Sequence, residues 1–236
     1  MSVYDNVLPH LFNINTSNGR ISWNNNYSIK GKLTIPYQID NTKVTGIEDN
    51  GFNGNSRYKP GMIGVTHIFW SDKNGAASPA FTTLGNSSNN EYSFANLSNL
   101  VYFQMPPTIT TIPTGCFNQC KSLFSGEFSS AASVNYAIEK TFKNITTIMN
   151  LSFTGVPITD LVIPKSVRVL AYRCFRNMSG LTTVTINSTD LIYEDCGVEI
   201  FNGNNSLTKV TMPTQYNTSE WLNKFDFSTD NIEYTT

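Results

Sequence analysis

The sequence predicts a β-rich solenoid, and two observations support this fold class. In five stretches of the 236-residue chain, a leading phenylalanine is followed by mostly apolar residues six, nine and eleven positions on, and a sixth stretch opens at Phe52 and resumes, after about seven extra residues, at Val65, Ile68 and Trp70. Each stretch also contains a short alternation of apolar and polar residues, which is typical of a strand with one buried face. Repeats of this kind bury their apolar sides only against their neighbours, so we expect short parallel strands stacked on one face. The leading residues are Phe52, Phe94, Phe117, Phe142, Phe175 and Phe201.

The unit that begins at Phe175 shows how one repeat is expected to fold. Leu181, Val184 and Ile186 alternate with threonines, so these three side chains would point inward and the threonines outward. A second apolar pair, eight and five positions before most of the phenylalanines, would line an opposite wall of turns and short helical or extended segments. The phenylalanine would fill the space between the two walls. The pairs are Val44 and Ile47, Ile109 and Ile112, Val134 and Ala137, and Val167 and Leu170.

One repeat is ambiguous. After Phe142, residues 148–153 and residues 158–163 both fit the strand pattern. The second segment runs directly into Pro164 and fits better as the strand before Phe175. The gap from Phe142 to Phe175 is 33 residues, against 23, 25 and 26 for the other neighbouring pairs from Phe94 onward. Either an insertion or an extra short rung would explain this gap, and both alternatives stay open.

The chain is expected to divide into three parts. Residues 1–28 would form an N-terminal cap or docking arm, residues 29–213 the solenoid, and residues 214–236 a C-terminal cap. Both ends carry large apolar side chains, which a solenoid needs there because an open end would expose its core. A loop inserted at about 71–93 is rich in glycine, serine and asparagine, and loops of this length are either functional or disordered.

Several segments resemble a known family. Residues 44–54 read V-T-G-I-E-D-N-G-F-N-G, residues 109–120 read I-T-T-I-P-T-G-C-F-N-Q-C, and residues 161–178 read L-V-I-P-K-S-V-R-V-L-A-Y-R-C-F-R-N-M. This pattern is similar to BspA-type leucine-rich repeats over about residues 29–213. The resemblance implies a leucine-rich-repeat solenoid that serves in binding, on bacterial surfaces, in some protists and in viruses that infect them. It implies no catalytic residues.

Composition narrows the set of partners. Charged residues make up 14% of the chain and the formal net charge is −1, so we expect no nucleic-acid partner. No stretch approaches the roughly 20 apolar residues that span a bilayer, so we expect no membrane insertion. The first ten residues lack a basic region followed by an apolar run, so we expect no Sec signal peptide.

Residues that usually carry catalysis are scarce. His10 and His67 are the two histidines, and the sequence contains no zinc-protease, phosphate-loop or serine-hydrolase motif. Cys116 and Cys120 lack the second ligand pair of a zinc site, and the four cysteines stand at or near core positions of the repeat. We therefore expect buried free thiols, no metal, no cofactor and no enzyme activity.

The outward positions of the strands form the candidate binding surface. These positions are aromatic or apolar in the N-terminal repeats and almost all threonine in the C-terminal ones. Aromatic side chains grouped on neighbouring strands suit a protein contact or a stacked sugar. It is equally open that Phe124 and Met149 are covered by the chain's own insertions. The candidate residues are Val101, Tyr102, Gln104, Phe124, Glu127, Met149, His67 and Phe69.

Together these features favour a non-enzymatic protein-interaction module. Our first hypothesis is a structural or host-recognition component of a phage virion, because the array is short, capped and low in charge. The alternative is a bacterial or protist cell-surface adhesin that binds host protein or glycan. The corresponding locations are the virion or the extracellular surface, and self-association into a homo-oligomer stays open.

Overall fold

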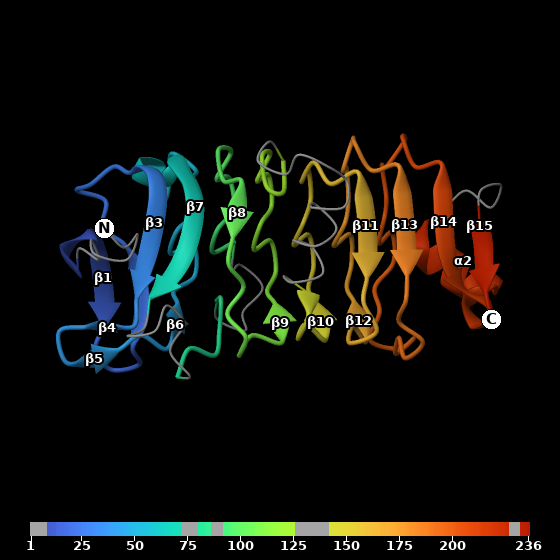
Figure 1. Ribbon diagram of the computed structural model, residues 1–236, viewed down its shortest axis with the longest axis horizontal. Helices are drawn as coiled ribbons and strands as arrows, with labels where there is room; N and C mark the ends of the chain where they lie inside the picture. The colour runs from blue at the N-terminus through green and yellow to red at the C-terminus, as the bar shows by residue number, and fades with distance from the viewer. Residues whose placement is uncertain (1–8, 72–79, 86–91, 126–141, 227–231) are drawn as a thin grey trace.

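The protein is an elongated solenoid whose rungs stack along one axis (Figure 1). The computed structural model describes residues 9–71, 80–85, 92–125, 142–226 and 232–236. The expected fold class, a β-rich leucine-rich-repeat solenoid with short parallel strands, is confirmed. Within the described part of the chain, no helix is both long and apolar enough to cross a membrane.

One long side of the molecule, here named the front layer, is built from two parallel sheets. The first has the order β3-β7-β8 and the second the order β11-β13-β14-β15. Side chains alternate along these strands, so that Val184 and Ile186 are buried while Thr183 and Thr185 are partly exposed. The strands are β3 (Lys30–Pro36), β7 (Gly64–Ser71), β8 (Tyr102–Phe103), β11 (Asp160–Ile163), β13 (Thr183–Ile186), β14 (Lys209–Pro213) and β15 (Ile232–Thr235).

A second wall carries the apolar pairs that precede the core phenylalanines. Its strands are two residues long, and β10 pairs in parallel with both β9 and β12. Thr83 bridges to Gly46, so part of the predicted 71–93 loop belongs to this wall, and Phe81 and Leu84 are buried beside it. The rest of that loop, apart from Ser71 and residues 92 and 93, lies outside the described residues. The short strands are β6 (Gly46–Ile47), β9 (Thr111–Ile112), β10 (Thr147–Ile148) and β12 (Val169–Leu170).

Between the two walls runs a column of stacked phenylalanine rings, here named the spine. Neighbouring rings lie 5.4–6.1 Å apart between centroids, at interplanar angles of 11–28°. Phe12 meets the first ring and Phe225 the last, at 6.1 and 6.4 Å, so both ends of the chain continue the column. The stacked members are Phe52, Phe94, Phe117, Phe153, Phe175 and Phe201.

The ambiguous repeat holds one rung, and its spine residue is Phe153. Phe142, which the sequence pattern assigned to this place, is buried and meets the edge of Phe153 at 5.4 Å and 76°. Ile148 belongs to the second wall in β10, and residues 160–163 form the front strand β11. Residues 126–141, which include the predicted pair Val134 and Ala137, lie outside the described residues.

Each spine phenylalanine lies in a backbone loop, and the loop has a similar conformation in most rungs. In most rungs the residues two before and two after it have positive φ, as Leu151 (57°) and Gly155 (74°) do around Phe153. The Phe153 amide donates to the carbonyl of Cys174, the residue before the next spine ring, at 2.9 Å. This loop forms a third line of hydrogen bonds along the solenoid, beside the two walls. Asparagine and glycine occupy many of its left-handed positions, because they adopt positive φ at little cost.

The N-terminal end is covered by an antiparallel hairpin. Strands β1 (Phe12–Asn15) and β2 (Arg20–Trp23) pair with each other, and β2 also pairs in parallel with β6. Phe12 and Trp23 are buried against the first rung. The smaller elements here are η1 (Pro9–Leu11), η2 (Pro60–Met62) and the hairpin of β4 (Gln38–Ile39) with β5 (Thr42–Lys43).

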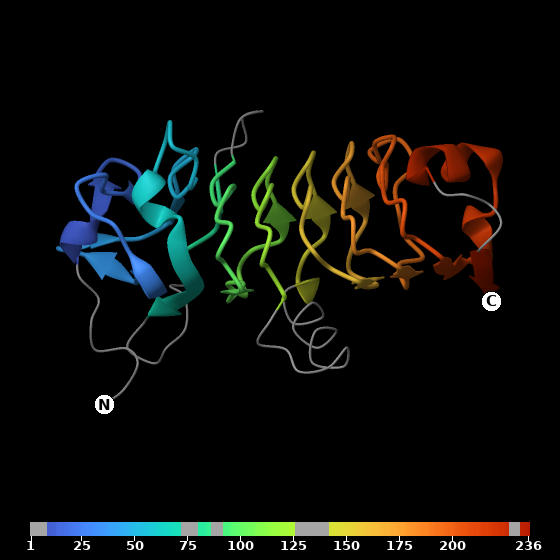
Figure 2. The same ribbon diagram turned by 90° about the horizontal axis from the view of Figure 1, so that it is seen from above.

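At the other end, η3 (Thr214–Tyr216) and α2 (Ser219–Phe225) cover the last rung. Thr218 caps α2 by accepting a hydrogen bond from the Trp221 amide, and Asp226 ends the helix in the left-handed conformation. Figure 2 shows α2 on the opposite side of the molecule from the front strands. The predicted domain boundaries at residues 28 and 213 stay predictions.

Candidate functional site

Three aromatic side chains meet on the outer surface of the front layer, and we name them the aromatic cluster: His67, Phe69 and Tyr102. Their placement follows from strand alternation, because Ile68 and Phe103 are buried on the other side of β7 and β8. The register pairs His67 with Tyr102, which brings the histidine and the phenol side by side. The cluster therefore combines residues from two neighbouring rungs.

The geometry of the cluster is compact. The ring centroids of Phe69 and Tyr102 lie 5.6 Å apart, and those of His67 and Phe69 lie 6.0 Å apart with nearly parallel planes, at 9°. His67 lies 6.3 Å from Tyr102. Phe69 and Tyr102 remain partly exposed, whereas His67 is only 6% exposed. The two exposed rings thus offer apolar faces that contact with one another holds in place.

His67 corrects one expectation. The sequence pattern placed it among exposed outward residues, but it is only 6% exposed and packs against the rings of Phe69 and Tyr102. Its Nδ1 lies 2.9 Å from the hydroxyl oxygen of Thr66, so the imidazole is also hydrogen-bonded. His67 therefore supports the two exposed rings from within the cluster.

Gln104 and Val101 hold the strands together beside the cluster. The Gln104 carboxamide oxygen accepts a hydrogen bond from the Trp70 amide at 3.1 Å, and the Gln104 carbonyl accepts one from the Trp70 indole at 2.6 Å. The Val101 amide donates to the Thr66 carbonyl at 2.8 Å. Both residues are partly buried. Their contacts position the cluster, and Val101 and Gln104 stay candidates for direct binding.

Two other candidates do not lie on this surface. Phe124 is 2% exposed and belongs to the hydrophobic core cluster, and its backbone is in the left-handed region with φ of 63°. Met149 follows β10 in the second wall, where its amide donates to the Ile112 carbonyl at 2.9 Å. It was misplaced because the pattern was counted from Phe142 instead of Phe153. Glu127 lies outside the described residues.

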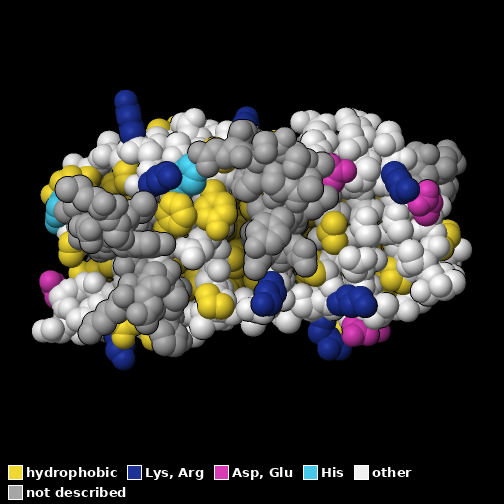
Figure 3. Space-filling view, viewed as in Figure 1, with side chains coloured by type: hydrophobic (Ala, Val, Ile, Leu, Met, Phe, Trp, Pro, Cys, Tyr) yellow, Lys and Arg dark blue, Asp and Glu magenta, His cyan; other side chains and the backbone are white. Residues whose placement is uncertain are grey.

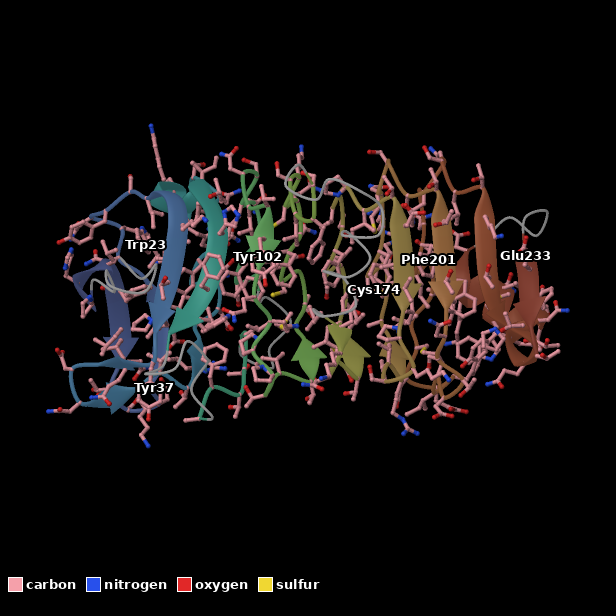
Figure 4. All side chains as sticks on the ribbon, in the orientation of Figure 1. Trp23, Tyr37, Tyr102, Cys174, Phe201 and Glu233 are labelled. Carbon is pink, nitrogen blue, oxygen red and sulfur yellow. The ribbon has the colours of Figure 1, made fainter. Side chains whose placement is uncertain are left out.

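The front layer of the C-terminal rungs has a different outer surface. Thr183 donates from its hydroxyl to the Asp160 carboxylate at 2.5 Å, and Lys209 pairs with Glu233 at 2.9 Å. Figure 3 shows hydrophobic side chains and a histidine gathered over β7 and β8, whereas mostly uncharged polar surface covers β13 and β14. Figure 4 labels Tyr102 on β8 within the aromatic region.

The titratable and metal-ligating side chains of the described ranges determine whether a metal could bind there. Among the described residues, no three histidine, cysteine or acidic side chains group as metal ligands. All four cysteines are free and buried, which confirms the expectation of core thiols. Burial raises the pKa of Cys120 to about 12 and also raises the pKa of Cys174 and of Cys196, so these thiols stay protonated at neutral pH.

The repeated rungs of this chain agree with its match to a known family of repeat proteins. The family described as BspA type leucine rich repeat region matches in six copies, over residues 84–155 and 146–235. No curated protein matches the chain.

Three solved structures illustrate the likeness. A leucine-rich repeat protein of T. pallidum is 14% identical, with a TM-score of 0.49, and the match covers 83% of this chain and 86% of that one. A leucine-rich cell surface protein of Faecalibacterium prausnitzii is 13% identical, with a TM-score of 0.27 and coverage of 95% and 93%. A leucine-rich repeat protein of Bacteroides ovatus is 12% identical, with a TM-score of 0.26 and coverage of 95% and 98%.

The family match extends over more than half of the chain, and it coincides with the rungs from Leu84 onward. Repeats of this kind build modules for protein interaction or surface adhesion, which are typically not enzymes. This chain belongs to the family of BspA-type leucine-rich repeat proteins.

Proposed function

We propose that this protein is a non-enzymatic recognition module that binds its target through the aromatic cluster. The observation that carries the proposal is the pairing of Phe69 with Tyr102, two partly exposed rings on adjacent strands. Aromatic side chains are enriched at binding hot spots because they offer large contact areas at a small entropic cost. The strands beneath them are fixed by the rung-to-rung hydrogen bonds, so the site is pre-organised.

The expected ligand is a glycan or a protein on a host surface. Flat rings bind the apolar face of a sugar, and they also receive apolar side chains of a protein. Lys32 and Thr34 on β3 pair in register with His67 and Phe69, so a charged and a polar group border the cluster. These groups would orient a ligand that contains hydroxyl or acidic groups.

The test compares binding by variants of the two halves of the front layer. Tyr102→Ala and Phe69→Ala should each weaken binding to intact host cells or to an immobilised glycan panel by roughly tenfold or more. Thr183→Ala and Thr185→Ala remove side chains from the same layer in the C-terminal rungs and should leave binding unchanged. Thermal unfolding of all four variants should stay close to that of the natural protein. Unchanged binding by both aromatic variants would contradict the proposal.

Two settings are proposed for this module. The family supports a bacterial or protist cell-surface adhesin, as members serve in surface adhesion. The low charge of the chain, with 14% charged residues, supports a structural or host-recognition component of a phage virion. Protease treatment of intact cells should remove a surface adhesin, whereas a virion component should copurify with particles.

A further inference from the structure

A cavity of about 380 Å³ lies where the front layer meets the N-terminal hairpin. Its apolar wall includes Leu11 of η1, Trp23 of β2 and Leu33 of β3. The Trp23 indole donates a hydrogen bond to the Tyr27 carbonyl at 3.0 Å, which fixes the ring in this wall. The volume lies within the range of small-molecule sites, so the cavity has room for a small ligand or for one end of a longer one.

The cavity is continuous with the aromatic cluster, because both share residues of β3. Lys32 and Thr34 line the cavity. The register of β3 with β7 also places Lys32 beside His67 and Thr34 beside Phe69. Neighbouring strands lie about 4.8 Å apart, so roughly 10 Å separate β3 from Tyr102 on β8. A ligand that covers the two exposed rings and also enters the cavity must therefore consist of several connected units.

The rim that joins the two regions is positively charged. Lys30 and Lys32 both line the cavity, and both are exposed. Neither lysine takes part in an ion pair between described residues. The described strands β3, β7 and β8 contain no acidic residue. Figure 3 shows a basic side chain next to the histidine and the hydrophobic side chains on this face. The rim should therefore attract an anionic group, since opposite charges attract across a binding surface.

We propose that the ligand is a glycan whose terminal sugar carries a carboxylate, with this sugar in the cavity and the preceding sugars on the exposed rings. The inference rests on the proposed function, because it uses the aromatic cluster, and it adds the class of ligand. The Lys30 and Lys32 ammonium groups would donate charge-assisted hydrogen bonds to the carboxylate, and Thr34 would bond a sugar hydroxyl. The apolar faces of the preceding sugars would lie on Phe69 and Tyr102.

The N-terminal end of the molecule favours a sugar over an acidic peptide. The elements η1 and β1 and the hairpin of β4 with β5 extend beyond β3 along the solenoid axis (Figure 1). They occupy the space that an extended peptide would need in order to add to the edge of β3 as a further strand. A terminal sugar needs no backbone pairing. Its hydroxyls and its apolar face match the polar and apolar side chains of the cavity.

The experiment is isothermal titration calorimetry of the full chain with two matched pairs of probes. One pair is sialyllactose and lactose, and the other is trigalacturonic acid and its neutral methyl ester. The natural protein should bind the acidic member of at least one pair about tenfold or more tightly than the neutral member. This preference should shrink as salt is added, because exposed charges are screened. The pair that shows the preference identifies which kind of acidic sugar the cavity accepts.

Variants separate the charged rim from the rings. Lys32→Gln should weaken binding of the acidic probe by about tenfold and leave the neutral probe unchanged, whereas Lys32→Arg should retain the preference. Tyr102→Ala should weaken both members of the pair, because it removes a contact that involves no charge. Lys43→Gln on β5, which does not line the cavity, is the matched control and should bind like the natural protein. Circular dichroism of each variant verifies that the strands are retained.

Three results would overturn the inference. They are equal binding of the acidic and neutral members of both pairs, which includes no binding of any probe, a preference that survives Lys30→Gln combined with Lys32→Gln, and tighter binding of hexaglutamate than of either acidic glycan. The proposed function would survive each of these results as long as Tyr102→Ala or Phe69→Ala still weakens binding to host cells. Loss of that effect would contradict the proposed function itself, so the two failures are distinguishable.

Discussion

The N-terminal and C-terminal halves of the front layer share one core and differ on their outer surface. Phe94 and Phe175 are equally buried in the spine, and both donate a backbone hydrogen bond to the next rung at 3.0 Å. Outside the core, β7 and β8 present Phe69 and Tyr102, whereas β13 presents threonines. The difference shows that inward positions specify the stack and leave the outward positions to specialise for binding.

The largest expected effect tests the shared core. Phe94→Ala and Phe175→Ala should each lower the free energy of unfolding by about 3–5 kcal/mol, because each removes a fully buried ring and leaves a cavity. Chemical denaturation of the two variants measures both losses. Losses that differ by several kcal/mol between the halves would show that the spine is not equivalent along its length.

A smaller effect is expected at Gln104, which belongs to the aromatic half. Gln104→Ala leaves the Trp70 amide without its carboxamide partner and should cost about 1–3 kcal/mol of unfolding free energy. Thr185→Ala, at an outward site of the other half, should cost less than about 0.5 kcal/mol. Urea unfolding curves of the two variants, fitted with the same dependence of free energy on urea concentration, measure both losses. Equal losses of unfolding free energy in the two variants would contradict the view that the Gln104 side chain connects neighbouring rungs.

The ion pair of Lys209 with Glu233 should contribute still less. Both side chains are at least half exposed, so Lys209→Ala should cost about 0.2–1 kcal/mol at low salt. The difference between the variant and the natural protein should shrink as salt is added, because screening already weakens the pair. Thermal unfolding of dilute protein at two salt concentrations measures this difference in stability. A loss that grows with salt would exclude an electrostatic contribution.

No reaction is expected at the thiols of the folded protein. Cys116 and Cys120 lie in the aromatic half and Cys174 and Cys196 in the threonine half, and all four are buried. Because burial raises the pKa of Cys120 to about 12, raising the pH to 9 should not make this thiol reactive in the folded state. A colorimetric thiol reagent added along a denaturant series measures exposure. Simultaneous reaction in both halves would indicate cooperative unfolding, whereas reaction of one half first would show that the two halves unfold separately.

Much of the fold could be predicted because the period of the apolar residues is repeated. Phe153 was missed because Phe142 lies at an ordinary spacing of 25 residues from Phe117, whereas the spine continues after 36. A signal for Phe153 was present: Ile145 and Ile148 stand eight and five positions before it, and a small serine directly precedes it.

The site was less predictable than the core. Alternation correctly placed Phe69 and Tyr102 on the outer surface, since the register of β7 and β8 follows from their buried residues. It misplaced Phe124, which is buried and has a left-handed backbone at a point where no glycine or asparagine marks a turn. His67 is buried and lies 6.3 Å from the Tyr102 ring of the next rung, and contacts between rungs are not encoded in one repeat.

The three lines of hydrogen bonds between rungs have a mechanical consequence. The first and last described residues, Pro9 and Thr236, lie at opposite ends of the stack (Figure 2), so a pulling force between them acts along these hydrogen bonds. Hydrogen bonds loaded lengthwise open one rung at a time instead of resisting shear together. Each opened rung in the C-terminal half frees 22–26 residues, which extends the chain by on the order of 80 Å. A module that connects two particles under a pulling force would thus lengthen in steps, and this lengthening would lower the tension before the bound ligand is released.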